Sequence, residues 1–239
     1  MLYLRSFLFL LFQIILTPPY AIACLLMAPL PRVRRFNFIT WWCRLVIGAA
    51  RVLCGIRYQV VGRENMGPGP YVILSKHSST WETLSLSYLF APMCYVAKRE
   101  LLWIPFFGWG FALASPITID RTRGTEAMQQ IAEQGRTRFQ QGFWILFFPE
   151  GTRIPAGQHG RYKSGGTRLA QMLNTPVLPI AHNAGYLWAK KRFVKYPGTI
   201  TVSVGKPIEM DGRDANEVMR EVESWVEGEV ARLGDPRER

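Results

Sequence analysis

A histidine and a glutamate lie five residues apart in the segment YVILSKHSSTWETLSL, residues 71–86. The apolar run before His77 predicts a buried strand and the segment after it predicts a helix, so His77 falls in a strand-to-helix turn. A carboxylate beside an imidazole fixes its tautomer and stabilises its charged form, which leaves the other ring nitrogen to take a proton from an alcohol. His77 and Glu82 are therefore candidates for a general base and its orienting acid.

The same residues also have an ordinary structural interpretation. Ser79-Thr80-Trp81-Glu82 fits the S-x-x-E capping box, with Ser79 at the N-cap and Glu82 at the third helical position. This interpretation explains Glu82 completely and leaves His77 unexplained, although a lone histidine at a strand end is more often a hydrogen-bonded loop residue than a catalyst. His182, in IAHN, is the competing base, but no acid lies at a comparable spacing from it.

A second polar group follows the apolar run FWILF. The segment FPEGTR, residues 148–153, combines a glycine turn, a hydroxyl, main-chain amides and an arginine. Such a turn at the carboxyl edge of an α/β sheet suits a phosphate or carboxylate ligand. A plain surface turn is the alternative interpretation.

The segment AKRELLWIPFFGWGFALASPITIDR, residues 97–121, holds five aromatic residues between Lys98 and Arg121. A cluster of this kind is usually core or interface. It also has the composition expected for the wall of an acyl-chain groove.

The N-terminal part of the chain has the character of a membrane anchor. Residues 7–30 contain no charged residue, and Pro18 and Pro19 interrupt this run, so we expect either a kinked span or a re-entrant hairpin. A cleaved signal peptide with Ala21-Ile22-Ala23 at its end is the alternative. Residues 36–56 predict a second helix at the membrane interface, with a core helix as the competing interpretation. The arginines flanking the apolar run place the rest of the chain in the cytoplasm, as at a bacterial-type inner membrane.

Beyond residue 55, short strand-like runs alternate with helical ones. This alternation predicts an α/β fold with a mostly parallel or mixed central sheet of about seven strands flanked by helices. We expect an anchoring region over residues 1–56 and a catalytic domain over 57–239. The expected strands are 57–61, 71–74, 94–97, 117–119, 143–148, 177–181 and 199–204, and the expected helices are 80–90, 125–140, 166–173 and 215–233.

The charge distribution and the cysteine spacing limit the classes of partner and metal that this chain is expected to bind. The net charge is +12, and residues 1–60 hold seven arginines and no acidic residue. Basic charge beside an apolar segment favours anionic lipid over nucleic acid. The basic and aromatic segment 186–198 suits lipid headgroups or an acidic carrier protein and matches no nucleic-acid module. The four cysteines show no metal-ligand spacing, so we expect reduced thiols in apolar surroundings and no metal site.

Taken together, HSSTWE, AKREL with IPFFGWG and ITIDR, FPEGTR and VLPIAHN resemble, in order and spacing, the four blocks of the lysophosphatidate acyltransferase family, the PlsC-like glycerolipid acyltransferases. The resemblance covers about residues 57–207. It implies transfer of a fatty acyl group from acyl-CoA or acyl-carrier protein to the sn-2 hydroxyl of lysophosphatidate. It also implies that the acyl thioester is a substrate and that no cofactor is required.

The resemblance also assigns roles to residues. His77 matches the family's histidine base and Glu82 its usual aspartate. The substrate-binding residues that it implies are Lys98, Arg121, Glu150, Gly151, Thr152 and Arg153. Two departures stand out: Lys76 replaces the common asparagine, and Glu82 is one methylene longer than aspartate. Another lyso-lipid acceptor, a thioester or lipid hydrolase using the same pair, and a non-catalytic lipid-binding protein are the alternative functions.

Overall fold

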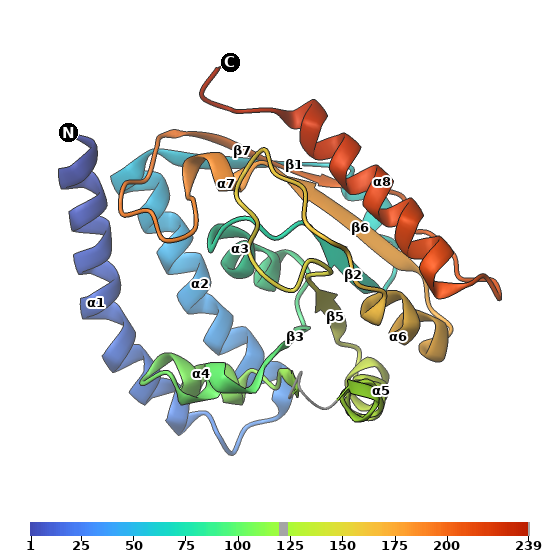
Figure 1. Cartoon of the computed structure of the whole chain (residues 1–239). Helices are drawn as coiled ribbons and strands as arrows, with labels where there is room; N and C mark the ends of the chain where they lie inside the picture. Colours follow the sequence, from blue (N-terminus) through green and yellow to red (C-terminus); the bar gives the residue numbers. More distant parts are fainter. Residues whose placement is uncertain (120–123, 239) are drawn as a thin grey trace.

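The computed structural model describes residues 1–119 and 124–238, and within these ranges seven strands form one mixed sheet (Figure 1). The strands are β1 (Ile56–Val61), β2 (Val72–Ser75), β3 (Met93–Lys98), β4 (Ile117–Ile119), β5 (Trp144–Phe147), β6 (Val177–His182) and β7 (Gly198–Val204). Their order across the sheet is β1-β7-β6-β2-β5-β3-β4. All neighbouring pairs are parallel apart from β6 and β7. The expected α/β class and sheet of about seven strands are confirmed.

Helices cover both faces of this sheet (Figure 1). The α-helices are α1 (Leu2–Leu26), α2 (Arg32–Cys54), α3 (Trp81–Leu89), α4 (Phe107–Leu113), α5 (Gly124–Gln140), α6 (Gly165–Leu173), α7 (Ala184–Leu187) and α8 (Ala215–Leu233). Two 3-10 helices are η1 (Arg63–Met66) and η2 (Arg99–Trp103). Helices α5, α6 and α8 pack on one face, while α2 and α3 lie on the other, with α1 and α4 outside them.

The central strands are covered on both faces, which explains their continuous apolar sequences. Every residue of β2 and of β6 is buried. Helix α6 approaches β2 closely because Gly166 has no side chain: a Cβ there would lie 2.4 Å from Leu74 Cδ2. The four cysteines are buried free thiols, as expected.

The N-terminal segment is one helix. Helix α1 continues through Pro18 and Pro19, so the re-entrant hairpin is wrong for this segment. Among the described residues, α1 is the one helix long and apolar enough to cross a membrane, with a mean hydropathy of 2.0 over an 18-residue stretch. Helix α2 packs between α1 and α3 and buries one side, including Phe36 and Val46, while Trp41 and Val52 on the other side are exposed.

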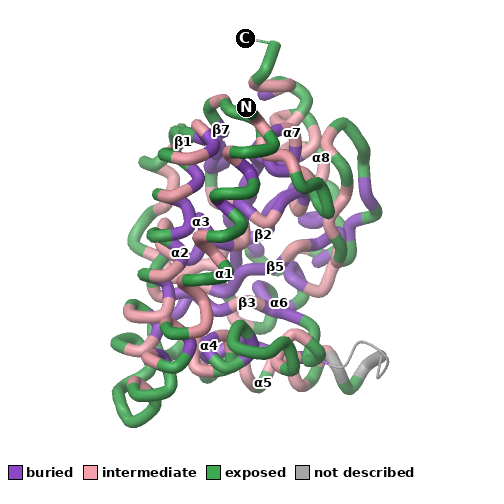
Figure 2. Tube along the Cα trace, turned by 90° about the vertical axis from the view of Figure 1, so that its left-hand side faces the viewer, coloured by how far each residue is buried: buried purple, intermediate pink, exposed green. Residues whose placement is uncertain are grey.

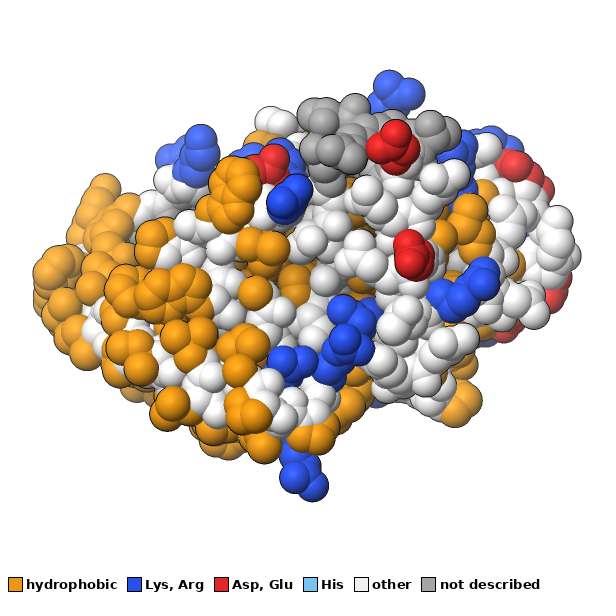
Figure 3. Space-filling view, turned by 90° about the horizontal axis from the view of Figure 1, so that it is seen from below, with side chains coloured by type: hydrophobic (Ala, Val, Ile, Leu, Met, Phe, Trp, Pro, Cys, Tyr) orange, Lys and Arg blue, Asp and Glu red, His pale blue; other side chains and the backbone are white. Residues whose placement is uncertain are grey.

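Exposed apolar side chains gather around α1 and α4. Figure 2 shows exposed and half-buried residues along much of α1. Seen from below, hydrophobic side chains cover the part of the surface on the α1 side of the molecule (Figure 3). The exposed set includes Phe7, Ile14, Ile15, Trp103, Ile104 and Trp109. Monomeric soluble proteins rarely expose so large an apolar surface, so this surface indicates a contact with a membrane or with a protein partner.

Candidate active site

Four neighbouring parallel strands bring the polar sequence blocks to one edge of the sheet. Strands β6, β2, β5 and β3 run in the same direction, so their carboxyl ends meet at that edge. His77 follows β2, residues 148–153 follow β5, His182 ends β6 and Lys98 ends β3. Ligands bind at this edge in open α/β sheets, and His77, His182, Lys98 and residues 148–153 converge there.

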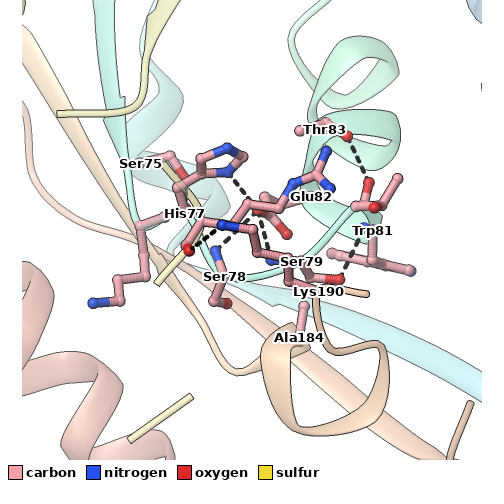
Figure 4. A network of polar contacts seen from close by, with 12 residues as sticks. Ser75, His77, Ser78, Ser79, Trp81, Glu82, Thr83, Ala184 and Lys190 are labelled. Atoms are coloured by element: carbon pink, nitrogen blue, oxygen red, sulfur yellow. Dashed lines mark hydrogen bonds and ion pairs between the residues drawn. The ribbon is translucent and has the colours of Figure 1, made fainter. Parts of the chain in front are cut away.

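The His77 and Glu82 side chains point toward each other (Figure 4). His77 Nδ1 lies 2.8 Å from Glu82 Oε1, which also accepts hydrogen bonds from the main-chain N–H groups of Ser78 (3.1 Å) and Ser79 (2.9 Å). The Glu82 side chain is fully buried, whereas 12% of the His77 side chain is exposed. Glu82 thus orients the histidine and closes the turn before α3 at the same time.

The predicted pairing of Ser79 with Glu82 is present, but helix α3 begins one residue later than the capping box predicts. The N-cap of α3 is Thr80 rather than Ser79, and it makes no side-chain capping bond. Ser79 Oγ instead accepts a hydrogen bond from Trp81 N at 3.0 Å. The reciprocal part of the box, from Ser79 N to the Glu82 carboxylate, is present.

The carboxylate of Glu82 fixes the tautomer of His77. Burial by itself raises the pKa of Glu82, but His182, His77 and the Ser79 N–H outweigh this effect and lower the pKa below its usual value. An ionised carboxylate only accepts hydrogen bonds, so Nδ1 of His77 carries the proton that it shares with Glu82. Nε2 of the neutral ring therefore holds the lone pair that a general base needs.

The loop after β5 holds His77 from several sides. The Phe148 ring stacks on the imidazole with a centroid distance of 3.9 Å and an angle of 16°. Glu150 Oε2 accepts a hydrogen bond from His77 N at 2.8 Å, and Ile154 N donates to His77 O at 2.8 Å. The FPEGTR loop is therefore part of the support of the histidine.

His182, the competing base, lies behind this pair. It is buried, its Nε2 donates to the carbonyl of Lys76 at 2.9 Å, and its Nδ1 accepts from Ala184 N at 3.3 Å. Burial lowers the pKa of His182, which keeps the ring neutral. Glu82 Oε2 lies 3.9 Å from His182 Nε2, so an acid is close, although no sequence spacing revealed it. With both ring nitrogens engaged, His182 has no lone pair to offer a substrate.

A cavity of about 580 Å³ opens beside His77. Its volume is in the range of about 300–1,000 Å³ typical of small-molecule sites. The lining is largely apolar and comes from α1, α2, α3, α4 and the β3 end; it includes Ala21, Phe36, Cys43, Leu84, Phe107 and Phe111. Exposed Lys98 and Lys190 line the same cavity as buried Phe36 and Leu84. The cavity thus joins a cationic surface region to an apolar interior, as a lipid with a charged headgroup requires.

The predicted substrate-binding residues divide into three groups. Lys98, Gly151, Thr152 and Arg153 line the cavity together with His77. Glu150 does not line it; its carboxylate is buried and lies 2.7 Å from Lys76 Nζ. Arg121 lies outside the described residues.

Lys190 and Phe148 are among the cavity residues that were not assigned to it from the sequence. Lys190 Nζ donates to Thr152 Oγ1 at 3.3 Å and to Arg153 O at 3.2 Å, so it supports the loop after β5 from the segment between α7 and β7. Phe148 was recognised only as part of a motif, not as the stacking partner of His77. Only the basic character of the 186–198 segment gave a signal for Lys190.

The fold and this site define an acyltransferase of the α/β class. A family model described as Acyltransferase matches residues 57–183, more than half of the chain. The chain therefore belongs to the acyltransferase family and is an enzyme of that family.

Individual relatives confirm the resemblance to the lysophosphatidate acyltransferases. The chain is 49% identical over 214 residues to "1-acyl-sn-glycerol-3-phosphate acyltransferase" from Pseudomonas aeruginosa, covering 88% of this chain and 83% of that protein. It is 34% identical to "1-acyl-sn-glycerol-3-phosphate acyltransferase alpha" from Mus musculus, over 73% of this chain and 63% of that protein.

A solved structure shares the fold. The crystal structure of the 1-acyl-sn-glycerophosphate (LPA) acyltransferase PlsC from Thermotoga maritima superposes with a TM-score of 0.79 and 22% identity. The match covers 96% of this chain and 95% of that one.

Proposed function

We propose that this acyltransferase moves a fatty acyl group from acyl-CoA or acyl-carrier protein to the sn-2 hydroxyl of lysophosphatidate, forming phosphatidate for phospholipid synthesis. One observation carries the proposal: His77, held by the buried Glu82 behind it, lies in the wall of a cavity that joins a cationic region to an apolar interior. The name of the Pseudomonas aeruginosa relative supports the same acceptor.

In the proposed reaction, His77 Nε2 takes the proton of the lipid hydroxyl as its oxygen attacks the thioester carbonyl carbon. Glu82 stabilises the imidazolium that forms. When the tetrahedral intermediate collapses, the carbon–sulfur bond breaks and the imidazolium returns the proton to the leaving thiolate. Main-chain N–H groups of the loop after β5 are the proposed donors to the oxyanion. The steps use protein groups and the two substrates, with no covalent acyl-enzyme and no cofactor.

Cationic side chains at the cavity are the proposed phosphate ligands. Arg153 and Lys98 line it, and Lys190 lies against Thr152 and Arg153. We assign Arg121 the same role from the family resemblance. A guanidinium group matches a phosphate with two parallel hydrogen bonds, so we expect Arg153 to contribute most among the cavity residues.

The apolar surface around α1 and α4 is the proposed membrane contact. Helix α1 has the length and composition of a membrane helix, and part of the same helix lines the cavity. A lipid acceptor would then enter the cavity without crossing water. We propose a bacterial inner-membrane location with the catalytic domain on the cytoplasmic side, because Arg32, Arg34 and Arg35 follow the apolar run.

The test is acyl transfer by the purified protein in lipid bilayers or detergent. The assay compares wild type with His77→Ala and with the matched control His159→Ala. Each protein is given lysophosphatidate and a labelled palmitoyl donor, which is either palmitoyl-CoA or palmitoyl-acyl-carrier protein. His159 is a suitable control because 56% of its side chain is exposed and its partner is Glu223. Phosphatidate and free fatty acid are both measured.

We expect phosphatidate from wild type and His159→Ala and none from His77→Ala. Phosphatidate at the wild-type rate from His77→Ala would refute the assignment of the base. Free fatty acid without phosphatidate, in the presence of the lipid acceptor, would indicate a hydrolase. Acylation of another lyso-lipid, with lysophosphatidate inert, would refute the proposed acceptor while leaving acyl transfer intact.

A further inference from the structure

A buried lysine precedes the histidine of the site. Lys76 is 2% exposed, and its ammonium group has three acceptors: Glu150 Oε1 at 2.7 Å, Glu227 Oε1 at 2.8 Å and the carbonyl of Gln158 at 3.2 Å. An ammonium group has three N–H donors, so each of them is used. Lysine is rarely buried unless it is paired. The site chemistry described above gives Lys76 no role.

The contacts of Lys76 lead directly to the main chain of His77. One oxygen of Glu150 accepts from Lys76 and the other accepts from His77 N at 2.8 Å. In the other direction, Glu227 belongs to α8 and also accepts from the hydroxyl of Tyr162 at 2.7 Å. A continuous series of hydrogen bonds therefore joins α8 to the turn that carries His77.

The main chain of Lys76 is fixed as well. His182 donates to its carbonyl at 2.9 Å, and Lys76 N donates to Ile180 O at 3.0 Å. Both contacts come from β6, the neighbour of β2 in the sheet. The side chain of Lys76 thus starts from a fixed point, and the positions of its acceptors determine where its charge lies.

We propose that Lys76 is a positioning residue for His77: its buried ammonium group fixes the Glu150 carboxylate against the His77 N–H and ties the catalytic turn to α8 through Glu227. The inference rests on the proposed function, in which His77 is the base. It extends that function by assigning a role to three charged residues outside the substrate cavity.

The charge of Lys76 is what makes Glu150 a good acceptor. Burial raises the pKa of Glu150 above its usual value, and Lys76 and the His77 N–H oppose this effect. The titratable groups that act on Glu150 include Lys76 and His77 from the turn after β2, Tyr162 from the loop before α6 and Glu227 from α8. Without Lys76 the carboxyl takes up a proton at higher pH, and its hold on the His77 N–H weakens.

Loss of Lys76 should therefore displace His77, the proposed base, from its position in the site. A shift of about 1 Å in a catalytic group lowers the rate by about 100-fold. The cavity contacts of the substrates involve other residues, so we expect kcat to fall while the KM values for both substrates stay within about twofold.

The experiment compares four variants of the full-length protein. Lys76→Met removes the charge at similar length, and Lys76→Met/Glu150→Gln also neutralises the partner while keeping an acceptor for the His77 N–H. Glu227→Ala breaks the tie of Lys76 to α8 and also removes the acceptor of the Tyr162 hydroxyl, at a side chain that is 18% exposed, while the contact between Lys76 and Glu150 is kept. Lys206→Met is the matched control at an exposed lysine. For each, kcat and KM are measured from pH 5.5 to 9.5, with thermal unfolding as the check on folding.

We expect Lys76→Met to lose about 100-fold in kcat, and we expect the acid limb of its pH profile to move to higher pH. The double variant should recover at least about tenfold of this loss and restore the wild-type pH profile. Glu227→Ala should lose about tenfold in kcat at unchanged KM, while Lys206→Met matches wild type. A residue needed only for folding would lower the amount of active protein without moving the pH profile.

The inference is overturned if folded Lys76→Met keeps kcat within about threefold of wild type with an unchanged pH profile. Should Lys76→Met not fold, wild-type kcat from Glu227→Ala overturns the link to α8. His77→Ala runs beside these variants to separate the two proposals. If His77→Ala keeps its acyltransferase activity, the proposed function and this inference both fail. If His77→Ala is inactive and Lys76→Met keeps wild-type activity, only the inference fails.

Discussion

Replacement of Glu82 by glutamine tests the electrostatic role of the carboxylate with little change of shape. Glu82 Oε1 accepts hydrogen bonds from two main-chain N–H groups, those of Ser78 and Ser79, besides its contact with His77. Those two N–H groups require an oxygen, so they hold the amide of glutamine in one orientation. That oxygen then still accepts from His77 Nδ1, and the tautomer of the histidine is retained.

The expected decrease in kcat of Glu82→Gln can be estimated from the negative charge that the substitution removes. Two unit charges about 4 Å apart attract each other by about 4 kcal/mol at an effective dielectric constant of about 20. The proton is only partly transferred in the transition state, so we assign about half of this attraction, ~2 kcal/mol, to stabilisation of the developing imidazolium. A loss of ~2 kcal/mol lowers kcat by about 30-fold.

The assay is steady-state formation of phosphatidate by wild type, Glu82→Gln and Glu82→Ala, with kcat and KM separated. Glu82→Gln should unfold near the wild-type temperature because its hydrogen bonds are kept. Glu82→Ala leaves two buried N–H groups without their acceptor, at a cost of about 1–3 kcal/mol each. We therefore expect a clear drop in thermal stability for alanine and not for glutamine.

Two results would refute this reasoning. A folded Glu82→Gln protein with a loss of about 10⁴-fold would behave like a triad whose histidine adopts the wrong tautomer, so the Ser78 and Ser79 N–H groups would not be holding the amide. A loss below about threefold would mean that no imidazolium charge develops beside residue 82.

Three further predictions concern the headgroup, the acyl chain and pH. Arg153→Ala should raise the KM for lysophosphatidate about tenfold at little change in kcat, because a charge-assisted hydrogen bond is lost. Gly110→Phe should shift the preferred acyl donor to shorter chains, since Gly110 lines the cavity and a Cβ there meets only Cys24 Sγ at 3.9 Å. His182 has a lowered pKa in the folded protein, so unfolding takes up a proton as the pH falls below about 6.5. Stability should then fall by at most about 1.4 kcal/mol per pH unit from this group, and His182→Asn should remove that slope in thermal unfolding between pH 7.5 and 5.5.

Each of these predictions has a matched control and a contradicting outcome. Lys206→Ala is the control for Arg153, and an equal KM for both variants would exclude a phosphate contact. Gly228→Phe is the control for Gly110, because nothing lies within 4 Å of a Cβ at Gly228; an unchanged chain-length profile would place the acyl chain elsewhere. His159→Asn should keep the wild-type pH slope, and the same slope in His182→Asn would contradict a neutral buried ring.

Local sequence patterns determined the elements of this protein. The apolar runs of β2 and β6 mark strands that are buried on both faces, and strand–helix alternation fixes the α/β class. The His77–Glu82 contact was also within reach of the sequence, because one turn of chain separates the two residues. Helix α4 was not recognised as a helix, since FGWGFAL is short and holds two glycines of low helix propensity.

The tertiary structure decided which distant residues complete the site. The order β6-β2-β5-β3 brings the FPEGTR loop against His77 and makes Glu150 a partner of Lys76 rather than a cavity residue. Lys76 and Glu227 are 151 positions apart, and their contact depends on where α8 packs on β6. The cavity likewise needs the packing of α1 and α2 against α4. No local window encodes such contacts, because they arise from strand order and helix packing summed over the whole chain.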